Sequence, residues 1–163
     1  MKRDKITQSR LKELLFYDPI TGYFVWKLEP SYRAKIGVRA GSSDGVYRMI
    51  GLDRVRYKEH RLAWLYMYGV WPEEIDHKDM DGTNNSLNNL RPATRSQNMM
   101  NKQCPANSMS GIKGVTHWRG LWRARISKNG VLIDLGTYET ANGAKAAYIA
   151  AAAKMHGEYA RTE

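Results

Sequence analysis

Cysteine is almost absent from this sequence, which contains Cys104 and no other. A single cysteine cannot form an internal disulfide or supply a multi-cysteine zinc site, so we expect a reducing, cytoplasmic compartment. Long hydrophobic runs are also missing, since no stretch approaches the roughly 18 apolar residues of a membrane helix. The opening segment MKRDKITQSR has no apolar run behind its charges, which argues against a signal peptide. These absences exclude a disulfide scaffold and a membrane protein.

Acidic residues are scarce relative to basic ones. The 163 residues include 26 Lys and Arg but 16 Asp and Glu, a formal net charge of +10 that indicates a polyanionic partner, most simply nucleic acid. Residues 1–72 carry 14 basic and 7 acidic side chains (net +7), residues 73–102 carry 4 and 5 (net −1), and residues 103–163 carry 8 and 4 (net +4). The pattern is either ordinary scatter around a basic mean or a metal-binding centre held against phosphates by basic flanks.

Local signals predict the elements of the first part of the chain. A helix is expected where leucines recur at helical spacing behind Thr7, a candidate N-cap, and it should end before Pro19 because a residue preceding proline disfavours the helical conformation. The predicted elements are that helix at residues 7–16, a strand at 23–27, a hairpin across 46–57 and a buried helix at 58–69 that stops at Gly69.

The rest of the chain reads as a polar centre, a linker and a second unit. Residues 73–90 predict a short strand, a long loop and a second short strand, and Thr94 with Gln97 fits a capping box at the start of a helix. Asn129-Gly130 is a strong hairpin signal. The remaining predictions are a helix at 94–102, a linker at 103–112, strands at 114–118, 121–127 and 131–138, and a helix at 141–156.

The polar centre contains a group of residues suited to phosphodiester chemistry. Asp76 can ligate a hard divalent cation, and His77, pointing to the other side of the same strand, can deprotonate a water near neutral pH. Asn98, near the start of the following helix, can add an amide oxygen ligand. Together these parts would hydrolyse a phosphodiester, with the metal stabilising the leaving oxygen.

The run EHRLAWLYMYGVWPEEIDHKDMDGTNNSLNNLRPATRSQN, residues 59–98, resembles the HNH endonucleases carried by phages and mobile introns, in their His-Asn-Asn variant. The resemblance implies a ββα-metal core in which His77 is the general base. It also implies that Asp76 and Asn98 hold one divalent metal, Mg²⁺ or alternatively Mn²⁺, and that Asn89 braces the loop orienting His77. The implied products are a 5′-phosphate and a 3′-hydroxyl.

The segment at about 114–160 resembles an AP2 DNA-binding domain through GV-x-x-W, WRARI, LGTY and an alanine-rich helix ending in HGEYA. The resemblance implies a three-stranded antiparallel sheet packed on one helix and placed in the DNA major groove. Strand alternation puts Arg123 and Arg125 on one face and Trp122 on the other. Trp118 and Trp122 either contact DNA or pack under the helix. The candidate DNA contacts are Lys113, Trp118, Arg119, Trp122, Arg123, Arg125 and Lys128.

Two further features have competing interpretations. His60 lies in a largely apolar helix, where a packed, hydrogen-bonded histidine is more common than a ligand, so we favour a structural role. The string HKDMDG is similar to the middle of a calcium-binding loop, but His77 stands where the first acid belongs and Asn88 replaces the closing Glu. A calcium site of that type is therefore disfavoured.

We expect an α+β chain with an N-terminal region at 1–102 that contains the HNH module (core about 59–102), a linker at 103–112 and an AP2-like domain at 113–163. The expected function is a monomeric, site-biased nicking or homing-type endonuclease acting on double-stranded DNA in a bacterial host, without a small-molecule cofactor. The alternatives are a non-catalytic DNA-binding regulator with a silent HNH core and an RNA-binding or RNA-cleaving module. The enzyme is favoured because all base and metal positions are filled.

Overall fold

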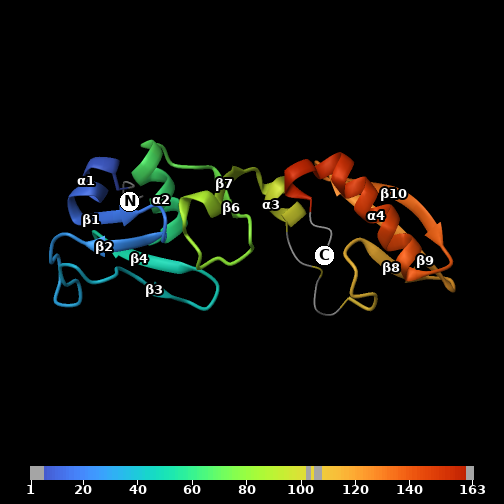
Figure 1. The fold of residues 1–163 in the computed structure, drawn as a ribbon, viewed down its shortest axis with the longest axis horizontal. Coiled ribbons are helices and arrows are strands. Elements are labelled where there is room, and N and C mark those ends of the chain that lie inside the picture. The colour runs from blue at the N-terminus through green and yellow to red at the C-terminus, as the bar shows by residue number, and fades with distance from the viewer. Residues whose placement is uncertain (1–5, 102–103, 105–107, 161–163) are drawn as a thin grey trace. The chain divides into compact units, whose positions relative to one another are not determined.

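The computed structural model describes residues 6–101, 104 and 108–160. The chain divides into two compact units, residues 1–93 and 94–163, and each is described by itself (Figure 1). Residues 103 and 105–107 of the predicted linker lie outside the described residues, and the domain boundaries expected from the sequence stay a prediction. Both units mix helices with small antiparallel sheets, as the α+β expectation requires. No helix among the described residues is long and apolar enough to cross a membrane.

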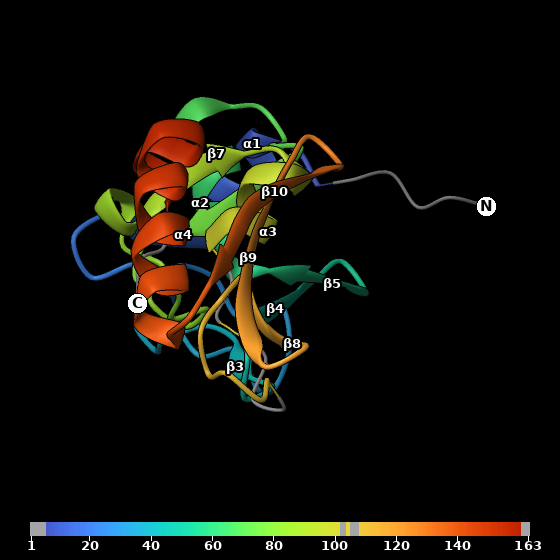
Figure 2. The same ribbon diagram turned by 90° about the vertical axis from the view of Figure 1, so that its right-hand side faces the viewer.

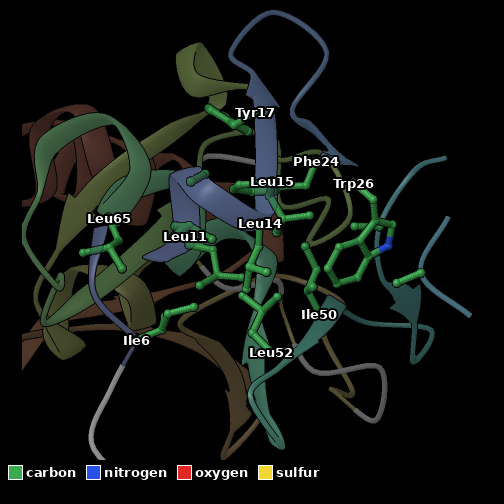
Figure 3. Packing of buried hydrophobic residues seen from close by; sticks show 14 of the residues in the cluster. Ile6, Leu11, Leu14, Leu15, Tyr17, Phe24, Trp26, Ile50, Leu52 and Leu65 are labelled. Atoms are coloured by element: carbon green, nitrogen blue, oxygen red, sulfur yellow. The ribbon is translucent and has the colours of Figure 1, made fainter. Parts of the chain in front are cut away.

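The described part of the first unit is built from three small sheets and two α-helices around one apolar core. Its elements before the last sheet are α1 (Gln8–Leu14), β1 (Leu15–Asp18), β2 (Tyr23–Trp26), β3 (Ser42–Ser43), β4 (Arg48–Leu52), β5 (Val55–Lys58) and α2 (Glu59–Tyr68). β1 pairs with β2, and β4 pairs with both β3 and β5. Figure 3 shows how side chains from α1, β1, β2 and β4 meet in the core, where Leu11, Leu15, Phe24 and Ile50 have no exposed surface.

The expected first helix is shorter than the leucine spacing indicated. It begins at the predicted N-cap Thr7, whose Oγ1 accepts a hydrogen bond from Arg10 N, but it ends at Leu14 rather than Phe16. Residues Leu15–Asp18 are extended because they pair with β2, which buries Leu15 and Tyr17 and leaves Phe16 52% exposed. The apolar run satisfied both a helical and an alternating pattern, and sheet pairing decided between them.

The hairpin and the second helix agree with the sequence prediction. β4 and β5 are joined by Asp53 and Arg54, both with positive φ as a tight two-residue hairpin turn requires. α2 follows directly and ends at Tyr68, with Gly69 as the C-cap whose N–H donates to Leu65 O. Leu62, Ala63 and Leu65 face the core, so α2 is fixed by its buried side.

A two-stranded ribbon completes the first unit. β6 (Glu74–His77) pairs antiparallel with β7 (Leu90–Ala93), and a short 3₁₀ turn, η1 (Leu87–Asn89), precedes β7. Ile75 and Leu90 anchor the ribbon in the same apolar core that holds α1 and α2. The strand, loop and strand predicted for residues 73–90 are therefore present, and η1 is an addition that the sequence prediction did not include.

The second unit consists of α3 (Arg95–Asn101), β8 (Val115–Trp118), β9 (Leu121–Lys128), β10 (Val131–Tyr138), α4 (Ala141–His156) and η2 (Gly157–Tyr159). The three strands form an antiparallel sheet with β9 in the centre, and α4 packs along one face of it (Figure 2). Ala144 and Ala152 are fully buried, so their small side chains bring the helix close to the sheet. The capping box is present: Gln97 N donates to Thr94 Oγ1, and Thr94 N donates to Gln97 Oε1.

Candidate active site

The two central residues of the site are neighbours in sequence on β6, but their side chains lie in different surroundings. Asp76 lies opposite Arg91 in the ribbon, and His77 lies opposite Leu90 at the end of β6. Alternation along the strand sends the two side chains to opposite faces. Both are nearly buried, with 7% and 6% of their surface exposed.

Asn89 holds the loop that connects the two strands. Its Oδ1 accepts a hydrogen bond from Asp79 N at 3.0 Å, and its Nδ2 donates to Asp79 Oδ1 at 2.8 Å and to Asn84 O at 2.9 Å. Its own carbonyl accepts from Lys78 N at 2.9 Å. One amide side chain therefore ties the beginning of the loop to its end, just beyond His77.

Close backbone packing also holds this loop against the N-terminal hairpins. Tyr17 donates its hydroxyl to Asn85 O at 2.8 Å, and Leu87 N donates to Pro19 O at 2.8 Å. A β-carbon on Gly22, which has a φ of +74°, would lie 2.2 Å from the Asn85 carbonyl carbon. A side chain at this position would therefore displace the loop, so the β1–β2 hairpin is part of the site's support.

The imidazole of His77 contacts a buried polar chain. His77 Nε2 lies 3.1 Å from Asn85 Oδ1, and Asn85 Nδ2 donates to Glu59 Oε2 at 3.2 Å. Glu59 is fully buried and forms an ion pair with Arg48, whose Nε lies 2.7 Å from Glu59 Oε2. Burial raises the pKa of Glu59, while the charge and hydrogen bond of Arg48 oppose that rise.

Two rings pack against His77. The His60 ring lies perpendicular to it with 4.9 Å between centroids, and the Tyr47 ring is 5.4 Å from His60 and 6.2 Å from His77. Burial lowers the pKa of His60 to about 3, with a smaller contribution from His77. His60 is therefore neutral at physiological pH and lines the site with an uncharged ring.

Asp76 forms a buried ion pair with its cross-strand neighbour. Arg91 donates from Nε to Asp76 Oδ2 at 2.8 Å, and Arg91 Nη2 lies 2.7 Å from the same oxygen. Charge-assisted pairs of this geometry are strong when they are shielded from water. The carboxylate beside His77 thus already has one cation of the protein bonded to it.

Asn98, the other predicted metal ligand, is the fourth residue of α3 in the second unit. Its backbone N–H donates to Thr94 O at 3.0 Å, which places it just inside the first turn of the capped helix. The structure thus brings Asp76, His77 and Asn89 together within the first unit. The approach of Asn98 to Asp76 stays a prediction from the sequence.

The donor set fits a hard divalent cation in its chemistry. Asp76 offers a carboxylate and Asn98 an amide oxygen, and Mg²⁺ commonly uses one or two such protein ligands with waters and substrate phosphates. A carboxylate has about four lone-pair positions, so Asp76 can accept Arg91 and still bind a cation. No group of three or more His, Cys, Asp or Glu side chains suited to a metal occurs among residues 6–101, 104 and 108–160.

The second unit presents a basic aromatic face on the side of its sheet that α4 does not cover. Arg123 and Arg125 alternate with Ala124 and Ile126, which are buried under α4, as the strand pattern predicted. Trp118 is 42% exposed, and the guanidinium carbons of Arg119 and Arg123 lie 4.8 and 5.4 Å from its ring centroid.

The other candidate DNA contacts have different surroundings. Trp122 packs against the buried cluster under α4, whereas Trp118 is 42% exposed. Contact of either ring with DNA stays a prediction. Arg123 is ion-paired with Asp134 of β10. Lys113 donates from Nζ to Met100 O at 2.5 Å and to Met99 O at 3.3 Å, so it also caps the end of α3. Lys128 is exposed at the end of β9.

Sequence reasoning missed the partners of the central residues. Glu59, Asn85 and Arg48 were not singled out, and neither was Arg91. Asn85 is 1% exposed and bonded to both Glu59 and His77, although it stands in an asparagine-rich stretch that has no distinguishing local pattern. A weak signal existed for Glu59, because an acid at the start of an apolar helix has to find a buried partner.

Comparison with known proteins finds a family match for the segment that contains this site. Residues 57–100, from the end of β5 into α3, match the HNH endonuclease family. A protein of Acanthamoeba polyphaga mimivirus named "Uncharacterized HNH endonuclease L560" is 30% identical over 114 residues, which are 68% of this chain and 59% of that protein. "Protein 3.8" of Escherichia phage T7 is 33% identical over 78 residues, which are 45% of this chain and 64% of that protein.

These matches cover only part of each relative, but the family match covers the central residues of the candidate site. The chain spans about 59–64% of the length of these two relatives. The family match includes Asp76, His77, Asn89 and Asn98, together with Glu59, Asn85 and Arg91. Residues 57–100 therefore carry an HNH endonuclease domain, and it coincides with the buried polar site described above.

Proposed function

We propose that this protein is a metal-dependent DNA endonuclease whose general base is His77. The observation that carries the proposal is the nearly buried pair Asp76 and His77 at the end of β6, inside the segment that matches the HNH endonuclease family. Because a carboxylate and an imidazole on successive residues of one strand point to opposite faces, the carboxylate can bind a cation while the imidazole accepts a proton from a water. The loop braced by Asn89 holds the imidazole in place.

The reaction is hydrolysis of a phosphodiester. His77 accepts a proton from a water, the water oxygen forms a bond to phosphorus, and the bond from phosphorus to the 3′ oxygen breaks. The products are a 5′-phosphate and a 3′ oxygen that solvent protonates. A divalent cation, with Asp76 and Asn98 as the proposed ligands and Mg²⁺ as the proposed metal, would supply charge stabilisation for the phosphate and the leaving oxygen.

The open face of the second unit is the proposed DNA-binding surface. Arg119, Arg125 and Trp118 lie on or beside it, and none of these side chains is buried. Arginines of this kind contact phosphates or read guanine in the major groove. The AP2-like role of this sheet, action as a monomer, and site-biased nicking of one strand are parts of the same proposal.

A supercoiled plasmid assay tests this function. Purified protein with Mg²⁺ or Mn²⁺ should convert supercoiled DNA to the nicked form, and chelation with EDTA should stop the reaction. His77→Ala should abolish cutting while DNA binding stays within about twofold. Sequencing the new ends should find a 5′-phosphate and a 3′-hydroxyl. Binding without cutting by the wild-type protein in either metal would contradict the proposal.

One observation favours the alternative of a non-catalytic DNA-binding regulator. The Arg91 guanidinium is bonded to Asp76 Oδ2, so the charge that a metal would balance is already balanced within the protein. A silent core of this kind would bind DNA but not Mg²⁺. Calorimetric titration with Mg²⁺ in the presence of a DNA duplex separates the two functions once the heat of Mg²⁺ binding to the duplex alone is subtracted. The endonuclease should lose the remaining heat in Asp76→Asn, whereas the regulator should show no remaining heat.

A further inference from the structure

A continuous chain of hydrogen bonds runs from Arg48 to His77 through the interior of the first unit. Arg48 Nε donates to Glu59 Oε2 at 2.7 Å, Asn85 Nδ2 donates to the same oxygen at 3.2 Å, and Asn85 Oδ1 lies 3.1 Å from His77 Nε2. The members come from β4, α2, the loop after β6 and β6 itself. Residues far apart in sequence therefore converge on one imidazole nitrogen.

The chemistry of each group fixes the direction of the next. An ionised carboxylate only accepts hydrogen bonds, so Glu59 requires Asn85 to turn its NH₂ group inward. That leaves the Asn85 carbonyl oxygen facing His77, and a carbonyl oxygen also only accepts. The His77 nitrogen facing it must then carry the proton. In a neutral imidazole the other nitrogen, Nδ1, holds the basic lone pair.

We propose that Glu59 and Asn85 are positioning residues that select the Nε2–H tautomer of His77 and so make Nδ1 the nitrogen that accepts the proton of the attacking water. The proposal rests on the proposed function of His77 as general base. In this proposal Glu59 and Asn85 do not touch the substrate, and both act only through the imidazole of His77. Without Glu59, the Asn85 amide could turn around and offer an N–H to His77, which favours the opposite tautomer.

The chain is held rigidly enough to enforce one tautomer. Glu59 has no exposed surface and Asn85 has 1%. Arg48 is itself fixed by hydrogen bonds from Nη2 to Ala40 O at 3.1 Å and to Gly41 O at 3.3 Å. The Asn85 backbone is held by the Tyr17 hydroxyl. Turning the Asn85 amide would set its carbonyl oxygen against the Glu59 carboxylate, which is unfavourable in a buried site.

Side-chain nitrogen NMR gives a readout that a merely structural role would not move. Long-range ¹⁵N–¹H correlation spectra distinguish the two tautomers of a neutral imidazole, and the signals of the four histidines are assigned with single-residue variants. In spectra recorded at about pH 8.5, wild-type His77 should show the Nε2–H form. In Asn85→Ala and Glu59→Gln the spectrum should shift toward a mixture with the Nδ1–H form.

Matched variants separate the orientation of His77 from general damage to the loop. Asn88→Ala removes an asparagine side chain from the same loop, and Glu73→Gln changes an exposed glutamate; both should keep the wild-type tautomer. Asn85→Ala retains the backbone carbonyl that Tyr17 contacts, so the loop keeps that anchor. If Glu59→Gln fails to fold, as measured by circular dichroism, the Asn85→Ala spectrum decides.

Cleavage rates complete the test. Under single-turnover conditions with saturating enzyme, Asn85→Ala and Glu59→Gln should cut about 10- to 100-fold more slowly, the usual effect of losing a partner that orients a site residue. Their DNA affinity should stay within about twofold of wild type. A wild-type Nδ1–H tautomer, or an unchanged tautomer in folded Asn85→Ala, would overturn the proposal. If the wild type cuts no DNA, the endonuclease proposal fails, and the spectra alone still decide the tautomer assignment.

Discussion

In the first unit, Asp76, His77 and Asn85 are each less than a tenth exposed, whereas in the second unit Trp118 keeps 42% of its surface exposed and Arg119 is exposed beside it. The first set is bonded to partners drawn from α2, β1 and β7, and the second is displayed on a sheet face. Buried polar groups are stabilised only when their partners are fixed. Exposed cations keep the freedom to follow a phosphate backbone. The contrast supports the proposed division of roles, in which the buried set of the first unit, with Asn98 of α3 as the second proposed metal ligand, serves the chemistry and the sheet face of the second unit supplies attachment.

The largest predicted effect breaks the buried pair of the first unit. Arg91→Met should leave the Asp76 carboxylate buried without its cation, and removing one partner of a buried pair costs about 3–5 kcal/mol. Urea unfolding of the purified variant measures this loss. Arg10→Met is the matched control, because Arg10 pairs with Asp53 and Glu13 at the surface and its loss should leave the midpoint unchanged. Equal midpoints for the two variants would contradict the description of Asp76 as buried and paired.

The second prediction concerns pH and the buried imidazole of His60. The pKa of His60 is lowered from its ordinary 6.5 to about 3, so the unfolded chain binds a proton that the folded chain does not. Its contribution to stability is complete above pH 6.5 and is lost as the pH falls toward 3, at about 1.4 kcal/mol per pH unit. Unfolding free energies at about pH 7 and about pH 4.5 should therefore differ less in His60→Phe than in wild type.

The control for this pH experiment is the exposed His117. His117→Gln should keep the wild-type difference between the neutral and the acidic measurement, because His117 lies on β8 of the second unit and its replacement leaves the buried His60 unchanged. A wild-type protein whose stability is the same at the two pH values would show that His60 does not remain neutral in the fold.

The third prediction tests the open face of the second unit. Removing two of its cations in Arg119→Ala/Arg125→Ala should weaken DNA binding about tenfold. It should also make the slope of log affinity against log salt shallower, by about 0.9 for each phosphate that is no longer neutralised. Fluorescence anisotropy at several salt concentrations measures both. Lys154→Ala removes an exposed cation from the last turn of α4, on the other side of the sheet, and should leave the slope unchanged.

The smallest predicted effect is one that the two units should share. Thr7 caps α1 and Thr140 caps α4, each through a hydrogen bond from a backbone N–H to its Oγ1. Replacing either threonine by alanine should cost about 1 kcal/mol of unfolding free energy. Thermal melts of Thr7→Ala and Thr140→Ala measure the two losses. A loss confined to one helix would show that local capping does not act alike in the two units.

Elements specified by neighbouring residues were predictable from the sequence. The bounds of α4, set by the caps Thr140 and Gly157, the turn at Asn129-Gly130 and the Thr94–Gln97 capping box all depend on residues within a few positions of one another. The end of α1 was not predictable in this way. Leu15 and Phe16 fit a helix locally, and only the distant β2 strand makes them extended.

The residues of the candidate site also differ in how far local sequence predicts them. Asp76 and His77 were predictable because adjacent acid and imidazole groups have recognisable chemistry. Their partners were not, because Glu59 lies 26 residues from Asn85 and Arg91 lies 15 from Asp76. A buried hydrogen bond between such positions leaves no period or motif in a single sequence. It becomes visible only when the ribbon and α2 are placed around the same core.

The rate of DNA nicking at saturating enzyme, measured in one turnover for His77→Ala and for Arg119→Ala/Arg125→Ala beside wild type, tests the division of roles most directly. General-base catalysis contributes about 10²- to 10⁴-fold. We therefore predict a loss of that size in His77→Ala with unchanged affinity, and a nearly unchanged rate in the double variant once its DNA is saturated. A His77→Ala protein that nicks DNA at the wild-type rate would contradict the account.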